Sequence, residues 1–296
     1  MSIFSSPEAK KKSNRGTEAV SFESLRAYKI LSFIHVCYNR MMKENKFLEV
    51  ALAAVKKAEP VFLKSFGRAS GIKVKHGAIE SLVTAADEEI ERLLVQEISA
   101  QFPHHAIVGE EGTSRQGSEY TWYIDPIDGT TNYVHGIHHC SISVALWDAQ
   151  GPLIAVVHDP IHVWTYTAIR GGGAFKNGQA IHVSTTDPLK EGVGALGWKA
   201  KDSVARNDLC TKIENNAYRF RVFSGSVLEL CFVASGILDF YVTVHANIWD
   251  LAAGILVLTE AGGTVTEKSG VPFIASSTNL LGTNTKLHSE LLSVLK

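Results

Sequence analysis

The run WYIDPIDGTTNYVHG at residues 122–136 constrains this chain more than any other segment. Its two acidic residues, Asp125 and Asp128, lie on either side of a proline and directly follow an apolar, strand-like stretch. Both carboxylates cannot enter a core, because an unpaired buried charge is costly, but they can share a divalent cation. The Gly-Thr-Thr sequence that begins at Gly129 offers backbone N–H groups and hydroxyls that suit a phosphate. The segment therefore predicts a metal beside a phosphate, and so phosphoryl chemistry.

Two further acidic elements accompany this run. The sequence VGEEG places Glu110 beside Glu111, and Trp249 with Asp250 precedes LAAGILVLTEAGG. Together with DPIDGTT, these elements resemble the signatures of the inositol monophosphatase family, magnesium-dependent and lithium-sensitive phosphatases of small polyol and sugar phosphates. The resemblance covers roughly residues 44–290 and keeps the family's order. It implies a layered αβαβα sandwich of the sugar-phosphatase type, with α+β and α/β parts, in a homodimer.

The resemblance also implies a set of metal ligands, which we carry over by position. Glu110, Asp125 and the backbone carbonyl of Ile127 would bind a first Mg²⁺. Asp125 would bridge to a second ion, which Asp128 and Asp250 would also hold, and Glu110 would touch a third. We expect two to three ions in the site, because Mg²⁺ takes few protein carboxylates and keeps several waters.

The remaining site residues follow in the same way from the resemblance. Thr130, backed by Asp87 from VTAADEE, would orient and deprotonate the attacking water, with Glu110 completing the catalytic group. Glu111 would support Glu110 from behind, and a lysine near Lys75 would face the site. The expected substrate contacts are Asp128, Gly129, Thr130, Gly225, Ser226 and Asp250.

Each assignment has a plainer structural alternative. Asp87 alone is typical of a first helical turn, Asp250 alone of a helix N-cap, and a Glu-Glu pair of a solvated loop. Three nearby histidines suggest a transition-metal cluster instead: His135, His138 and His139. The surrounding ligands are hard oxygens, which favours Mg²⁺.

Substrate choice is less constrained than metal chemistry. Thr243 stands where the family has a substrate-contacting glutamate, and FSGSVLELC around Gly225 and Ser226 is one residue shorter than the family's usual stretch. A hydroxyl binds ring hydroxyls more weakly than a carboxylate does. We therefore expect a permissive phosphomonoesterase that hydrolyses inositol monophosphate and related polyol or sugar phosphates.

Other functions stay open at this point. The main substrate could be fructose 1,6-bisphosphate, histidinol phosphate or a nucleotide 3′-phosphate. The chain could also be a metal-dependent sugar-phosphate binder without turnover, or a scaffold in which the N-terminal arm acts. The complete set of Glu110, Thr130 and Asp87 argues against both non-catalytic readings.

Composition excludes several other classes. The 296 residues are 45% hydrophobic and 20% charged, with a formal net charge of −1. No basic run suits nucleic acid, and no apolar run approaches the ~18 residues of a membrane span. Four scattered cysteines without a C-x-x-C pair indicate buried thiols in a reducing compartment. We expect a cytoplasmic protein that binds a small phosphorylated polyol or sugar, and neither nucleic acid nor membrane.

The chain is expected to fall into three parts. Residues 1–41 read as a non-catalytic extension; an organelle-targeting presequence and an interface arm stay open, although the segment lacks a signal-peptide cleavage pattern. Residues 42–190 would form an α+β subdomain with the metal site. Residues 191–296, where strands and helices alternate, would form an α/β subdomain that completes it.

Periodicity predicts the elements that hold the site. A first helix begins near Met42, with Pro60 kinking or splitting it, and Thr84 caps a second helix. Strands follow from residue 106 onward. The sequence GGGAFKNG at 171–178 lacks the P-loop pattern and lies between strands, so we interpret it as a hairpin.

Overall fold

The computed structural model describes residues 22–68, 73–74, 82–117, 119–198 and 203–296. Contacts divide the chain into two compact units, Met1–Lys43 and Glu44–Lys296. Helix α1 (Phe22–Ser65) begins in the first unit and ends in the second. The second unit contains the sheets, the remaining helices and the candidate site, and the following description concerns this unit.

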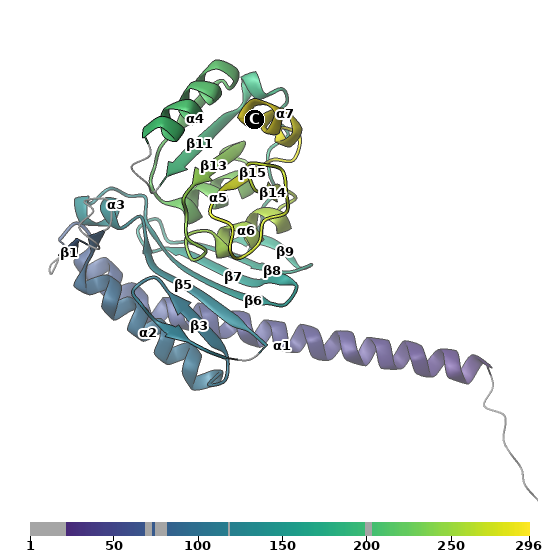
Figure 1. The fold of residues 1–296 in the computed structure, drawn as a ribbon. Coiled ribbons are helices and arrows are strands. Elements are labelled where there is room, and N and C mark those ends of the chain that lie inside the picture. The colour runs from purple at the N-terminus through teal and green to yellow at the C-terminus, as the bar shows by residue number, and fades with distance from the viewer. Residues whose placement is uncertain (1–21, 69–72, 75–81, 118, 199–202) are drawn as a thin grey trace, which may run out of the picture. The chain divides into compact units, whose positions relative to one another are not determined.

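The larger sheet has eight strands in the order β10-β9-β8-β7-β6-β5-β3-β4 (Figure 1). Neighbouring strands are antiparallel, except that β3 and β5 are parallel. The parallel pair matters for the site, because the carboxyl ends of β3 and β5 meet at one edge. The strands are β3 (Ala106–Gly109), β4 (Ser114–Arg115), β5 (Thr121–Asp128), β6 (Ser141–Asp148), β7 (Gly151–Asp159), β8 (Trp164–Ile169), β9 (Gly173–Lys176) and β10 (Gln179–Ala180).

The smaller sheet has five strands in the order β12-β11-β13-β15-β14, with β12, β11 and β13 parallel to one another. Its strands are β11 (Val193–Trp198), β12 (Arg219–Arg221), β13 (Phe240–Val244), β14 (Thr264–Thr266) and β15 (Leu280–Thr283). A separate two-stranded pair joins β1 (Lys73–Val74) to β2 (Leu82–Val83). The helices after α1 are α2 (Ala85–Gln101), α3 (Thr130–His135), α4 (Ser203–Asn216), α5 (Ser226–Ala234), α6 (Ala252–Glu260) and α7 (His288–Leu295), with a 3-10 turn at Leu189–Glu191.

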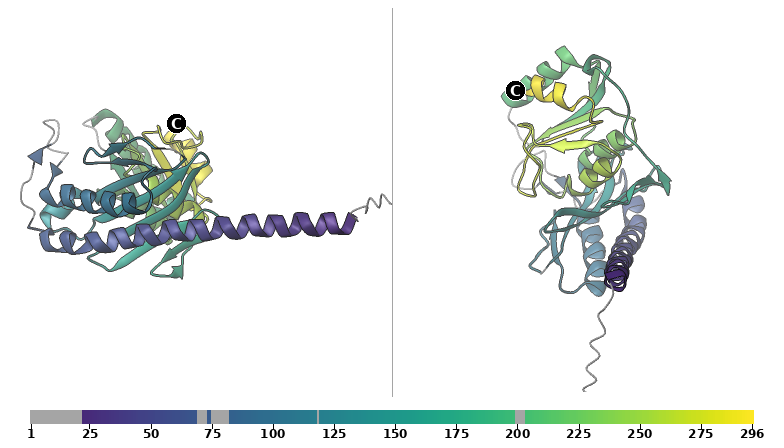
Figure 2. Two further views of the ribbon diagram at one scale, coloured as in Figure 1. Left: turned by 90° about the horizontal axis from the view of Figure 1, so that it is seen from below. Right: turned by 90° about the vertical axis from the view of Figure 1, so that its right-hand side faces the viewer.

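Three buried clusters define five layers. Residues 44–65 of α1 pack with α2 on one face of the larger sheet, around Phe47 and Trp122. Helices α5 and α6 fill the space between the sheets, in a buried cluster that includes Leu230 and Tyr241. Helices α4 and α7 cover the outer face of the smaller sheet. The right-hand view of Figure 2 shows these layers in succession, and the expected αβαβα sandwich is confirmed.

Several local predictions can be compared with the structure. Thr84 caps α2 in a full capping box with Asp87. The segment 171–178 contains β9, which forms antiparallel hairpins with β8 and β10, so both predictions are confirmed. The predicted start of the first helix is wrong: α1 begins at Phe22, because neither Gly nor Pro interrupts the chain before Pro60. The helix also continues through Pro60 without being split.

None of the helices in the described part of the chain has both the length and the apolarity that crossing a bilayer would require.

Candidate active site

The Asp-Pro-Ile-Asp sequence forms an irregularity in β5. The pairing of β5 with β6 shifts register between Asp125 and Asp128. Pro126 lies in this bulge, where its missing N–H removes no ladder hydrogen bond. The Asp125 Oδ1 atom accepts a hydrogen bond from the Ile127 N–H at 3.1 Å. The bulge therefore lets both carboxylates leave the sheet near one point while the strand itself stays buried.

Three carboxylates converge at the carboxyl end of β5. Glu110, Asp125 and Asp250 each offer an oxygen, and these oxygens all lie within 4.8 Å of one another. Glu110 follows β3 and is positioned by the parallel β3–β5 pairing, with its N–H donating to the Ile124 carbonyl at 3.2 Å. Asp250 arrives from the turn before α6. Asp125 and Asp250 are almost fully buried, so this oxygen-only set fits a hard divalent cation.

Asp128 lies outside that group of three. Its Oδ2 atom accepts a hydrogen bond from the Val227 N–H at 2.9 Å, at the first turn of α5. A negative charge is stabilised there by the helix dipole. Asp128 thus joins the larger sheet to α5, and its role as a metal ligand stays a prediction.

Thr130 is held between a carbonyl and a carboxylate. Its Oγ1 atom lies 3.0 Å from the Ile127 carbonyl oxygen and 3.4 Å from Asp87 Oδ1. The other oxygen of Asp87 accepts hydrogen bonds from Thr84, from N–H at 2.8 Å and from Oγ1 at 2.6 Å. Asp87 therefore combines the two interpretations that its sequence allowed, since one oxygen caps α2 and the other faces Thr130.

Burial changes the proton affinity of Asp87. Its side chain is fully buried, and this burial raises the pKa of the carboxyl to about 6, with the negative charge of Glu110 acting in the same direction. Hydrogen bonds from Thr84 oppose the shift. A carboxyl with a pKa near neutrality suits proton exchange at physiological pH.

Two glycines, Gly129 and Gly225, allow the segment before α3 and the start of α5 to approach each other closely. Gly129 has a φ of 84°, and a Cβ there would lie 2.8 Å from the His139 carbonyl oxygen and 3.1 Å from that of Ser224. Gly225 is the N-cap of α5, and a Cβ there would lie 2.8 Å from the ring of His139. Larger residues at either position would separate α3 from the start of α5.

The sequence interpretation missed Glu91. This buried carboxylate on α2 accepts hydrogen bonds from the N–H groups of Glu111 at 2.8 Å and Thr113 at 3.0 Å. Gly109 makes room for it, because a Cβ there would lie 2.5 Å from Glu91 Oε2. Glu91 thus fixes the loop that carries Glu110. The available signal was a second acid, four residues after Asp87, on the apolar face of a helix.

Glu229 was missed as well. It is completely buried in α5, and its Oε1 atom accepts a hydrogen bond from the Phe223 N–H at 3.2 Å. Burial raises the pKa of this carboxyl to about 8, and the negative charge of Asp128 adds to the shift. Glu229 holds the turn before α5, in which Ser224 has a left-handed φ of 62°. No local pattern identified it, because an acid inside an apolar helix has many possible roles.

Two of the expected supporting residues can be placed only in part. The Glu111 backbone N–H is fixed by Glu91, while its support of Glu110 stays a prediction. Lys75 lies outside the described residues.

The histidines next to the motif do not form a metal group. Within the described residues, the acidic trio is the only set of three metal-binding side chains that converge. His139 is buried against Phe223, with ring centroids 4.8 Å apart, and burial lowers the pKa of its imidazole to about 4. His138 packs against Phe66 at 5.4 Å. These residues serve as packing groups.

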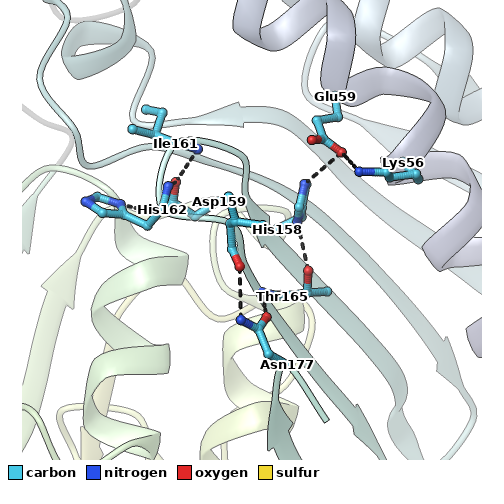
Figure 3. Close-up of polar contacts among 9 residues, drawn as sticks. Lys56, Glu59, His158, Asp159, Ile161, His162, Thr165 and Asn177 are labelled. Carbon is cyan, nitrogen blue, oxygen red and sulfur yellow. Dashed lines mark hydrogen bonds and ion pairs between the residues drawn. The ribbon is translucent and has the colours of Figure 1, made fainter.

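A second polar network involves histidines outside this site (Figure 3). His158 Nδ1 lies 2.9 Å from Thr165 Oγ1, and His158 Nε2 lies 3.5 Å from Glu59 Oε2. Burial lowers the pKa of His158. His162 Nδ1 lies 2.6 Å from Asp159 Oδ2. These contacts hold β7 and the turn after it, and neither histidine belongs to the converging acidic group.

Comparison with known proteins gives a consistent result. The family model described as "Inositol monophosphatase family" matches residues 43–296. A fructose-1,6-bisphosphatase/inositol-1-monophosphatase of Thermotoga maritima is 36% identical over 248 residues, which cover 84% of this chain and 95% of the relative. Inositol monophosphatase 2 of Solanum lycopersicum is 35% identical, with 84% and 98% covered. A Nus factor SuhB of Pseudomonas aeruginosa is 32% identical, with 84% and 95% covered.

Solved structures agree with these relatives. An IMPase of Thermotoga maritima superposes with a TM-score of 0.78 at 35% identity, covering 84% of this chain and 96% of that one. The extragenic suppressor protein suhB of Bartonella henselae gives a TM-score of 0.81 at 30% identity, with 85% and 98% covered. Sequence, fold and the converging carboxylates agree, and the chain belongs to the inositol monophosphatase family.

Proposed function

We propose that this protein is a Mg²⁺-dependent phosphomonoesterase of inositol monophosphate and related polyol or sugar phosphates. Family membership supports a phosphatase. The observation that carries the finer proposal is the convergence of Glu110, Asp125 and Asp250 beside the Thr130–Asp87 pair. In this proposal the three carboxylates would bind a hard cation, and Asp87 would accept a proton beside it.

The proposed ligands for two to three Mg²⁺ are Glu110, Asp125, Asp250, Asp128 and the Ile127 carbonyl. Bound Mg²⁺ would lower the pKa of water and neutralise phosphoryl oxygens. The Thr130 hydroxyl would accept a hydrogen bond from the attacking water. It would donate its own hydrogen to Asp87 Oδ1, 3.4 Å away.

The substrate side of the proposed site involves the remaining expected contacts. The N–H groups of Gly129 and Thr130 would hold the phosphate. Gly225 and Ser226 would contact the substrate together with Asp128 and Asp250.

Substrate preference is proposed to be broad. Thr243 lies near the carboxyl end of β13, and its side chain carries a hydroxyl and no charge. Contacts to the metal and the phosphate should therefore dominate substrate binding. Fructose 1,6-bisphosphate is a second candidate substrate, because the 36% identical Thermotoga maritima relative carries both activities in its name. We expect less than about tenfold discrimination between inositol 1-phosphate and other polyol or sugar phosphates.

We also propose a homodimer that works in the cytoplasm. The described cysteines, Cys140, Cys210 and Cys231, are free thiols, which fits a reducing compartment. Sedimentation of the purified chain tests the dimer, and imaging of a tagged full-length chain in its own cell tests the compartment.

Phosphate release tests the catalytic proposal. The wild-type protein with Mg²⁺ should hydrolyse inositol 1-phosphate, fructose 1,6-bisphosphate and glycerol 2-phosphate, and excess EDTA should abolish the activity. Asp125→Asn should lower kcat by at least about 10³-fold. The matched control is Asp148→Asn, which alters an ion pair with Arg170 and should leave kcat unchanged. Activity that persists in EDTA would contradict the proposal.

Lithium gives a further test of the proposed second ion. Millimolar Li⁺ should inhibit turnover at saturating substrate, because a monovalent ion can occupy a carboxylate site without supplying the charge of Mg²⁺. Unchanged turnover in tens of millimolar Li⁺ would argue against a second site built by Asp125, Asp128 and Asp250.

A further inference from the structure

Three hydroxyl groups converge at the carboxyl end of β13. Tyr241 and Thr243 are two residues apart, so their side chains leave the same face of the strand, and Thr243 pairs with Gly197 of β11. A Cβ on Gly197 would lie 2.2 Å from the Tyr241 hydroxyl and 2.9 Å from Thr243 Oγ1. The third hydroxyl is that of Ser226, 2.9 Å from the Tyr241 hydroxyl. Gly197 leaves the space in which this chain of hydroxyls forms.

The hydrogen bond between Tyr241 and Ser226 has a defined direction. The Tyr241 hydroxyl donates to Ser226 Oγ, and the nearby Thr243 hydroxyl partly opposes the effect of burial on the pKa of Tyr241. A serine hydroxyl has one hydrogen and accepts through its lone pairs. Because Tyr241 uses an acceptor position of Ser226, the hydrogen of Ser226 is available to point elsewhere. Tyr241 is completely buried, which raises the pKa of its phenol and keeps it a donor.

Ser226 lies at the edge of the candidate site. It is the first residue of α5 and is only half-buried, whereas the neighbouring Gly225 and Val227 are buried. The Val227 N–H binds Asp128, so Ser226 is one residue from a contact to a proposed metal ligand. The metal carboxylates Glu110 and Asp125 and the proposed phosphate-binding groups come from the larger sheet and α3. Ser226 and Tyr241 instead come from α5 and the smaller sheet, so neither lies on the elements that carry the proposed phosphate-binding groups.

We infer that Tyr241 is a positioning residue, which holds Ser226 so that the serine hydrogen is directed at a hydroxyl of the substrate's alcohol group. This inference rests on the proposed phosphatase function. In this arrangement an uncharged donor faces the alcohol, so the site recognises any polyol that offers a hydroxyl acceptor at that place. Tyr241 itself stays buried and does not touch the substrate.

Tyr241→Phe is the test, because it removes one oxygen and keeps the ring. KM for inositol 1-phosphate should rise about fivefold, the effect of one neutral hydrogen bond, with kcat within about twofold. The Ki of inorganic phosphate, which has no alcohol group, should not change. Tyr166→Phe is the matched control, since it removes the hydroxyl of another fully buried tyrosine, on β8, and should leave KM and Ki as in the wild type.

A second variant protects the test from a folding defect. Ser226→Ala changes a half-buried position and should raise KM by a similar factor, and the double variant should be no worse than Ser226→Ala alone, because both changes break one chain of contacts. Additive effects, or a Ki for phosphate that rises in parallel with KM, would overturn the inference. So would an active Tyr241→Phe protein with wild-type KM. A wild-type protein that releases no phosphate from any polyol phosphate would overturn the proposed function and this inference with it.

Discussion

Glu229→Gln should remove a pH-dependent loss of folding stability that arises from a buried carboxyl group. The carboxyl is fully buried in α5, and its Oε2 atom has no hydrogen bond within the described residues. Burial and the charge of Asp128 raise its pKa from 4.5 to about 8, although backbone N–H groups of residues 223–225 oppose the shift. Glutamine has nearly the same shape and stays neutral at every pH, so the substitution isolates the effect of ionisation.

The magnitude follows from linkage between protonation and folding. Between pH 4.5 and about 8 the folded protein keeps a proton on Glu229 that the unfolded chain releases. The free energy of unfolding therefore falls as pH rises through this window, by up to about 1.4 kcal/mol per pH unit. At pH 7 the accumulated effect reaches about 3 kcal/mol as an upper value. The variant lacks this contribution, so its stability should exceed that of the wild type increasingly as pH rises.

Urea denaturation followed by circular dichroism measures this difference. Wild type and variant are unfolded with urea in the presence of EDTA, at pH values of about 5, 6, 7 and 8. The difference between their free energies of unfolding is then plotted against pH. Other titrating groups, such as Asp87 and His139, cancel in the difference. Glu260→Gln is the matched control, because that carboxylate also accepts backbone hydrogen bonds, from Gly171 and Gly173, but is partly exposed. A difference that stays flat from pH 5 to 8 would refute the reasoning.

Three more predictions concern loop support, packing and the N-terminal segment. Glu91→Ala removes the acceptor that fixes the Glu110 loop, so the Mg²⁺ concentration for half-maximal activity should rise about 10–100-fold; an unchanged Mg²⁺ titration would contradict this. Gly197→Ala places a methyl 2.2 Å from the Tyr241 hydroxyl and should lower the free energy of unfolding by about 1–3 kcal/mol in urea; wild-type stability would show that the strands can shift. A chain that starts at Met42 should keep its Tm and kcat/KM, because the core begins at Phe47; a Tm lower by several degrees would show that residues 1–41 stabilise the protein.

The local part of the site could be predicted from sequence. One short segment contains Asp125, Asp128 and the Gly-Thr-Thr turn. The bulge that presents them is therefore determined by the local sequence. Asp87 was also recognisable, because a capping box is a local pattern. Its second contact, to Thr130, depends on α2 lying beside α3, and only the family resemblance suggested it.

The supporting residues could not be predicted, for a physical reason. Glu91, Glu229 and Tyr241 act through partners distant in sequence, and an acid or a tyrosine in an amphipathic segment has no local signature of that contact. The start of α1 was missed for the opposite reason. A local signature exists there, because the chain from Phe22 to Glu59 contains neither Gly nor Pro.

The origin of the converging carboxylates on both halves of the chain has a consequence during synthesis. Glu110 and Asp125 leave the ribosome long before Asp250, with a delay on the order of ten seconds at ordinary rates of translation. Until the smaller sheet and α6 have folded, a nascent chain presents two of the three converging carboxylates and no third. The complete trio therefore forms late, and a prematurely terminated chain that ends before the turn at Asp250 carries the recognisable motif without it.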